Sequence, residues 1–407
     1  MKDTASGPLA GVMVLDLSRV LAGPWATQAL ADLGAEVIKV ERPGAGDDTR
    51  QWGPPFALQA DGRAGDAAYF FAANRGKRSV TVDIARPLGA DLVRRLAAKA
   101  DILVENFKVG GLKKYGLDYA SLAALNPRLV YCSITGFGQT GPDAGRAGYD
   151  YMIQAVGGLM SITGEPGRPP VKVGVAVADL FAGLYASNAI LAALLHARGT
   201  GVGQHIDIAL FEAQAAMLAN QASNWFVSGI VPGRLGATHP NLAPYQPLPT
   251  QDGALVVAVG NDSQFQALCL ALKAPGLGSD SRFATNAGRV GHRDELTAAL
   301  ESRTAVWTTR ALIAALEAAG VPCGPINTVE QVFAEPQAKA RALVVEQARA
   351  DLEEPVRTVA SPMRLSKTPV SYDAPPPALG ADTEPVLMEQ LGLTQDEIAG
   401  LREAGVL

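Results

Sequence analysis

The N-terminal third of the chain alternates short apolar runs with amphipathic stretches, and this alternation restricts the fold more than any other feature. VMVLD at 12–16 is a short apolar run that ends in an acid, which is typical of a buried strand. The stretch 17–35 reads as a turn and a helix, and EVIKVE at 36–41 as a second strand. Because parallel strands need a long crossover between them, this spacing predicts a βαβ unit in a parallel sheet.

The same pattern continues to about residue 138. Strands are expected in SVTVDI, DILVEN and LVYCSITGFG, with a helix over 86–100. The order predicts an α/β fold with a Rossmann-like large domain. Its first turn, DLSRVLAGP at 16–24, lacks the GxGxxG fingerprint, so binding of a nicotinamide dinucleotide is not expected.

Polar and cationic residues recur just after the predicted strands, where open parallel sheets bind their ligands. Any one of them alone is as well explained by a solvated loop, but the recurrence favours an anionic ligand. The residues are Arg19, Arg42, Arg50, Lys77, Arg78, Asn106, Lys108, Tyr149 and Asp150.

The residue pattern of the chain changes near residue 224, and we expect the chain to fold into three parts. Residues 1–224 form the N-terminal part of the large Rossmann-like domain. Residues 225–330 contain a strand and several helical patterns, which predict a smaller α/β domain. Residues 331–407 are Pro-rich, with short strands and a final helix, and are expected to be a linker and C-terminal segment.

Composition excludes several classes of partner. The net charge of −5 argues against nucleic acid. Three cysteines without a CxxC pair and four histidines without ligand spacing argue against a disulfide framework or a metal site. The first residues lack the apolar run of a signal peptide, and no apolar run reaches about 20 residues, so we expect a cytoplasmic protein without membrane spans.

Asp179 is the acid near the start of a long apolar helix. From Leu180 to Leu195 every residue is apolar or small except Ser187 and Asn188. A carboxylate facing so much apolar surface costs free energy unless it has partners or a chemical role. It is equally compatible with a plain helix cap, and the residues alone leave both interpretations open.

Several motifs favour the chemical role of Asp179 over the helix cap, because they indicate a family. DLSRVLAGP, ERPGAGDDTRQWGPPF, NRGKRSVTVDI, YCSITGFGQTGP, RAGYD, VADLFAGLYA and GPINTVEQVFAEPQ together resemble the class III (CaiB/BaiF-type) CoA-transferases. The resemblance runs from about Gly11 to the C-terminus and is strongest to members that move CoA from succinyl-CoA to glutarate or another short dicarboxylate. It implies that 331–407 returns to the large domain, that two chains interlock as a homodimer, and that Asp179 is the nucleophile.

In this family the nucleophile attacks an acyl-CoA to give a mixed anhydride and then an aspartyl-CoA thioester. An ordinary aspartate, with a pKa of about 3.9, is ionised at neutral pH and ready to attack. CoA and its thioesters are substrates, and no permanently bound cofactor or metal is expected. Residues implied to hold CoA are Leu21, Ala22, Arg42, Val82, Asp83, Ile84, Ala85, Asn106, Phe107, Lys108 and Lys114.

A dicarboxylate leaves one carboxylate unreacted, and a guanidinium can hold it in a bidentate manner. Arg19, Arg75 and Arg146 are the candidates, although each could instead pair with an acid of the fold. Tyr149 is a further candidate for the substrate side. The family's glycine-rich shield has no GGGG counterpart here, and the stretch around His239 is the nearest substitute.

Two alternatives stay open. An α-methylacyl-CoA racemase shares the fold but needs a histidine in the segment that corresponds to 144–150, which reads AGRAGYD. A non-catalytic acyl-CoA-binding protein would keep the basic loops but would have no use for Asp179 in an apolar helix.

Overall fold

The computed structural model describes residues 7–407, which divide into two compact units. The first comprises residues 7–159, Val173–Ser223 and Lys339–Leu407, and the second comprises Met160–Lys172 and Asn224–Ala338. Two boundaries differ from the predicted ones. The segment 160–172 packs with the second unit instead of the large domain, and the second unit extends to 338 instead of 330.

The first unit is built on a six-stranded sheet whose paired strands all run parallel, in the order β5-β2-β1-β6-β7-β8. The predicted α/β fold with a parallel sheet is therefore confirmed. The chain builds outward from β1 to β2 and β5, then returns to the other side of β1 for β6, so the strand order reverses between β1 and β6. The strands are β1 (Met13–Asp16), β2 (Glu36–Glu41), β5 (Lys77–Thr81), β6 (Ile102–Glu105), β7 (Val130–Thr135) and β8 (His205–Ala209).

Helices cover both faces of this sheet, because successive side chains of each strand point to opposite faces. Val14 packs in one core and Leu15 in the other. The first core also takes residues of α1 (Ala22–Asp32), α5 (Asp150–Val156), α7 (Val177–Thr200) and α8 (Leu210–Met217). The second takes α3 (Pro87–Ala97), α4 (Tyr119–Leu125), α17 (Thr383–Leu391) and α18 (Gln395–Glu403).

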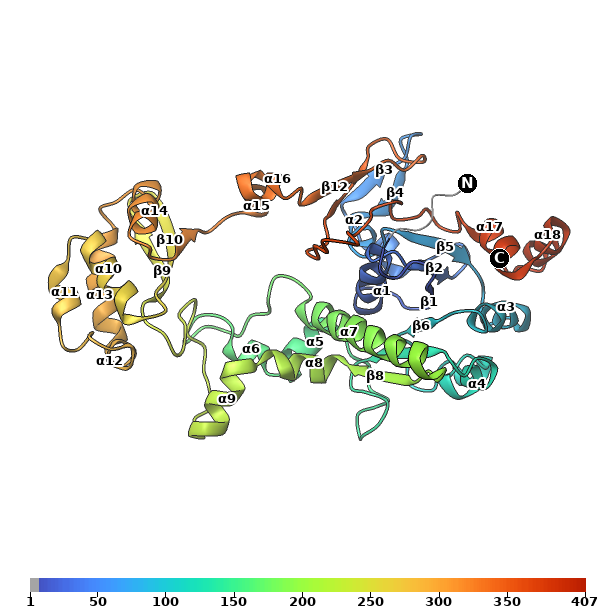
Figure 1. The fold of residues 1–407 in the computed structure, drawn as a ribbon, viewed down its shortest axis with the longest axis horizontal. Helices are drawn as coiled ribbons and strands as arrows, with labels where there is room; N and C mark the ends of the chain where they lie inside the picture. Colours follow the sequence, from blue (N-terminus) through green and yellow to red (C-terminus); the bar gives the residue numbers. More distant parts are fainter. Residues whose placement is uncertain (1–6) are drawn as a thin grey trace. The chain divides into compact units, whose positions relative to one another are not determined.

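The C-terminal segment of the chain belongs to this unit. Helix α17 packs against β5 and α3, and Figure 1 shows the red C-terminal helices beside these blue elements. The smaller elements of the unit are β3 (Phe56–Leu58), β4 (Ala64–Ala67), α2 (Ala68–Phe71), β12 (Val344–Gln347), β13 (Val356–Val359), and the 3-10 turns Asp48–Gln51 and Lys113–Tyr115.

Helix α7 is the central helix of the first core and lies beside α1 (Figure 1). Small residues on its inner face allow a close approach: a Cβ on Gly183 would lie 2.7 Å from the carbonyl oxygen of Ala22. Among the described residues α7 is the one helix long and apolar enough to cross a membrane by length and composition. Its inner face packs against α1, α8, β7 and β8 in the first core.

The second unit has an antiparallel sheet in the order β11-β10-β9 and its own hydrophobic core. Its strands are β9 (Tyr245–Thr250), β10 (Gly253–Ala258) and β11 (Cys323–Pro325). Its helices are α10 (Asp262–Ala271), α11 (Pro275–Ser279), α12 (Asn286–Gly291), α13 (Arg293–Thr304), α14 (Thr309–Ala318) and α15 (Val329–Ala334), and the helices at the unit boundaries are α6 (Leu159–Ile162), α9 (Ala219–Ser228) and α16 (Pro336–Ala340).

Candidate active site

A cavity of about 1020 Å³ opens at the carboxyl ends of the parallel strands of the first unit. The segments that follow β1, β2, β5, β6 and β7 each contribute to its wall. Residues 144–149 and Asp179 complete it. The cavity lies where the strand order reverses, which is the place where open α/β sheets bind ligands.

Most of the predicted site residues meet in this cavity. Asp179, Arg19, Arg146 and Tyr149 line it. So do all the residues that the resemblance assigned to CoA: Leu21, Ala22, Arg42, Val82, Asp83, Ile84, Ala85, Asn106, Phe107, Lys108 and Lys114. The structure thus gathers into one wall residues that are up to 160 positions apart in sequence, from 19 to 179.

Arg75 does not face the cavity, and its predicted role as a substrate ligand is corrected. Its side chain is 4% exposed and donates to both carboxylate oxygens of Asp32 at 2.8 and 2.7 Å. Its remaining nitrogen donates to the carbonyl oxygen of Val359 at 2.6 Å. Arg75 therefore joins α1 to β13, and its guanidinium is buried outside the cavity wall with each of its three nitrogens already donating to a partner.

His239 lies in the second unit and is not among the residues that line the cavity. Its Nδ1 accepts hydrogen bonds from the backbone N–H groups of Asn241 and Leu242, and its ring packs 5.0 Å from that of Tyr245. These contacts fix the local turn.

Arg19 and Arg146 keep exposed guanidinium groups. Arg19 pairs with Asp48 at 2.9 Å, and Arg146 lies 3.5 Å from Asp143 and over the ring of Phe137. Exposed pairs of this kind contribute about 0–1 kcal/mol. Either arginine can therefore exchange its present partner for an anionic ligand at little cost.

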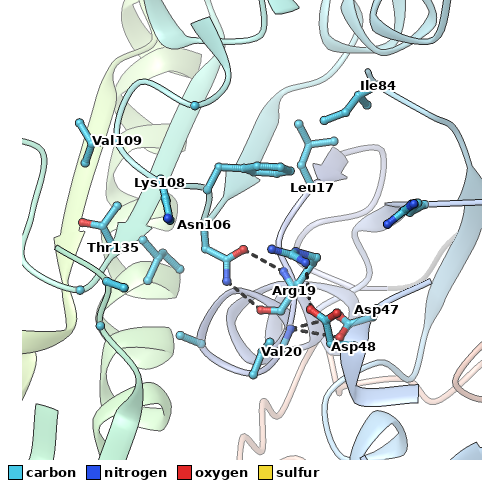
Figure 2. Close-up of a pocket in the computed structure, with 18 of the residues that line it drawn as sticks. Leu17, Arg19, Val20, Asp47, Asp48, Ile84, Asn106, Lys108, Val109 and Thr135 are labelled. Atoms are coloured by element: carbon cyan, nitrogen blue, oxygen red, sulfur yellow. Dashed lines mark hydrogen bonds and ion pairs between the residues drawn. The ribbon is translucent and has the colours of Figure 1, made fainter. Parts of the chain in front are cut away.

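The loop between β1 and α1 is held in an unusual backbone conformation. Val20 has a φ of 71°, which is rare for a β-branched residue. Its N–H donates to both oxygens of Asp47, and the side chain of Asn106 bonds both the N–H and the carbonyl of Arg19 (Figure 2). Strain of this kind persists where the surroundings over-determine the backbone, and here it fixes Leu21 against the cavity.

Buried charged residues stabilise this loop. Lys39 and Asp47 are fully buried and lie 2.9 Å apart, and the Lys39 ammonium also donates to the carbonyl of Ser18. Burial alone would raise the pKa of Asp47, but Lys39 and hydrogen bonds from Thr49 hold it at about 2. Lys77, predicted to belong to the ligand edge, is instead buried against Asp16, and burial lowers its pKa to about 8.

Asp179 is the third residue of α7 and lies partly buried in the cavity wall. Burial, and then the negative charge of Asp150, raise its pKa to about 7. The sequence-based expectation of a carboxylate with an ordinary pKa is therefore corrected: the raised pKa leaves part of the molecules protonated at neutral pH.

Two neighbours of Asp179 had no predicted role in the chemistry, although Asp150 was among the polar residues expected at the ligand edge. Asp150 acts on it electrostatically, and Tyr69 of α2 has its hydroxyl pKa raised by burial and by the charges of Asp179, Asp150 and Asp47. The sequence pattern indicated Asp150 at the ligand edge, directly after the candidate Tyr149. Nothing in the local pattern of Tyr69 indicated the cavity, because α2 is a four-residue helix far from the other motifs.

The described part of the chain holds no group of three or more His, Cys, Asp or Glu side chains placed to bind a metal ion. The cavity wall, also entirely within residues 7–407, contains no histidine. What it offers is one carboxylate with a raised pKa and several cations, which suits covalent chemistry on a long anionic ligand.

The chain belongs to CoA-transferase family III, whose family model matches residues 9–383. Enzymes of this family transfer CoA. Among its curated relatives, succinate–glutarate CoA-transferase of Agrobacterium fabrum is 54% identical over 94% of this chain and 95% of its own. Human succinyl-CoA:glutarate CoA-transferase is 45% identical over 98% and 90%. The crystal structure of a CaiB/BaiF family protein from Brucella suis matches with a TM-score of 0.84 at 52% identity, covering 95% of this chain and all of that one.

Proposed function

We propose that this enzyme transfers CoA from succinyl-CoA to glutarate or a similar short dicarboxylate, through a covalent intermediate on Asp179. The observation that carries the proposal is that Asp179 lies in the same cavity wall as the loops that the family resemblance assigns to CoA. The two glutarate-specific relatives, which align over nearly the whole chain, support the choice of substrates.

In the proposed reaction a carboxylate oxygen of Asp179 attacks the thioester carbon of succinyl-CoA, and CoA leaves as the thiolate. The thiolate then attacks the aspartyl carbonyl, which forms the aspartyl-CoA thioester and releases succinate. Glutarate repeats these steps in reverse and leaves as glutaryl-CoA. Leu21 and Ala22 flank the thioester, Asn106 to Lys108 follow the pantetheine, and Arg42 meets a phosphate group.

The second carboxylate of the acceptor needs a cation within the cavity. With Arg75 bound to Asp32, Arg19 and Arg146 are the remaining candidates, and both are exposed on the cavity wall. We propose that one of them holds this carboxylate through a bidentate pair.

We also propose that the active form is the interlocked homodimer implied by the resemblance, in the cytoplasm. Support for a partner comes from large apolar side chains on the outer face of α7, namely Phe181, Leu184, Tyr185 and Leu195, of which Leu195 is 76% exposed. An apolar face of this kind on a helix marks a surface that another protein covers. The absence of disulfides among the three cysteines agrees with a reducing compartment.

The test is intact-mass analysis after mixing the enzyme with succinyl-CoA. We expect a hydroxylamine-sensitive adduct that maps to Asp179, is missing in Asp179→Asn, and persists in the matched control Asp373→Asn, an exposed acid outside the cavity. A protein that binds CoA, forms no adduct and transfers nothing would be an acyl-CoA-binding protein. Exchange of an α-proton with deuterated water would instead indicate a racemase.

A further inference from the structure

Helix α7, which carries Asp179, begins without a cap of its own. Its N-cap residue, Ala176, has no side chain that could accept a hydrogen bond from the first turn. The acceptor comes from another element: Oδ1 of Asp150, the first residue of α5, accepts from the N–H of Ala178 at 2.8 Å. This N–H is one of the first-turn groups without an intrahelical partner. Ala178 is the direct neighbour of Asp179, so Asp150 fixes the turn that presents the nucleophile.

The second oxygen of Asp150 extends this support. It accepts from the side-chain amide of Gln154 at 2.7 Å, one turn further along α5. Gln154 is fully buried, and its own carbonyl oxygen accepts from the N–H of Val173 at 2.9 Å. Asp150 and Gln154 together hold both ends of residues 173–178, the segment that leads into Asp179.

Both of these donors to Asp150 are uncharged, so neither neutralises its negative charge, and that charge acts on Asp179. The other titratable group coupled to Asp179 is Tyr69. Three cations of the cavity wall are paired with acids: Lys39 with Asp47, Arg19 with Asp48 and Arg146 with Asp143. Arg42, Lys108 and Lys114 also line the cavity. The titratable and charged residues on the elements packed against α7 are, besides Asp150, Tyr151 on α5, Asp32 on α1, Glu212 on α8, Tyr131 and Cys132 on β7, and His205 and Asp207 on β8.

We propose that Asp150 is a positioning residue for the nucleophile. It caps the helix that carries Asp179, and its charge disfavours the free carboxylate of Asp179 relative to the acylated forms of Asp179. The inference rests on the proposed function. When Asp179 becomes the CoA thioester, its negative charge leaves with the released succinate, and the repulsion from Asp150 disappears. The like charge therefore raises the energy of the free enzyme but not of the thioester, which favours the intermediate.

The test uses two variants that keep a cap acceptor but remove the charge, Asp150→Asn and Asp150→Ser. The matched control is Glu212→Gln, which removes one exposed charge from α8 outside the cavity wall. Two quantities are measured: the midpoint of the acid limb in the pH dependence of kcat/KM, and the ratio of aspartyl-CoA thioester to free enzyme at pH 8 by intact mass.

Both variants are expected to move the midpoint to lower pH and to reduce the thioester ratio. The two effects must agree, because each unit of midpoint shift corresponds to a tenfold loss of thioester. Wild-type values of both quantities in folded Asn or Ser variants, or equal changes in Glu212→Gln, would overturn the inference. A wild-type enzyme that forms no thioester would overturn the proposed function instead, and the inference with it.

Discussion

Replacing Asp179 by Asn is expected to stabilise the protein, by an amount that grows with pH. Burial and Asp150 raise the pKa of Asp179 to about 7 from its ordinary 3.8. A carboxyl group with a raised folded pKa holds its proton more tightly in the folded than in the unfolded state. The loss of folding stability that ionisation of this carboxyl group causes is therefore absent below about pH 3.8 and complete above about pH 7. The wild-type protein loses stability as the pH rises through this interval, and an uncharged Asn does not.

The shift sets an upper limit for the effect. From 3.8 to about 7 is a difference of about 3 units, which corresponds to at most about 4 kcal/mol. Part of this penalty is already present at pH 5, and solvent in the cavity screens the charge. Between pH 5 and pH 8.5 we therefore expect the advantage of Asp179→Asn to grow by about 1–2 kcal/mol.

Urea unfolding of wild type and Asp179→Asn at the two pH values measures this difference. Asp373→Asn, which removes an exposed carboxylate, is the control and should show no growth with pH. The variant should also lose transfer activity, because Asn lacks the carboxylate nucleophile. The wild-type carboxylate lowers the stability of the folded protein but is required for the reaction. A stability difference that is the same at pH 5 and pH 8.5 would refute the electrostatic argument. Retention of more than a few per cent of activity in Asp179→Ala would remove Asp179 from the mechanism.

Three further predictions follow from the side-chain contacts. One of the two variants Arg19→Ala and Arg146→Ala should lower kcat/KM ten- to a hundredfold for glutarate but much less for butyrate, because one charge-assisted contact contributes about 1.5–3 kcal/mol; equal losses for both acids in both variants would assign the two arginines to CoA or the fold. Arg75→Ala should destabilise the protein by about 3–5 kcal/mol in denaturant titrations, since Asp32 is left buried without its partner, and should leave the preference for dicarboxylates unchanged; a selective loss on glutarate would contradict this structural role. Light scattering at micromolar concentration should give twice the chain mass, and a folded monomer would contradict the interlocked dimer.

The sequence by itself determined the sheet of the large unit and the position of the ligand cavity. Apolar runs such as 12–16 and 36–41 with a helical pattern between them leave little alternative to parallel strands, and parallel strands gather their following loops at one edge. That geometry places Arg42 and Asn106, which follow β2 and β6, at one edge of the sheet, whereas the assignment of Asp179 to the same site came from the family resemblance.

Only the tertiary structure decided what these side chains do once gathered. Arg75 and Arg146 look equivalent in the sequence, but Asp32, 43 positions from Arg75, binds Arg75 in the fold and leaves Arg146 exposed. The pKa of Asp179 depends on the apolar surroundings of α7 and on Asp150, and the conformation of Val20 depends on Asp47. Burial and charge pairing act over a few ångströms in space, and sequence distance does not record which groups come that close.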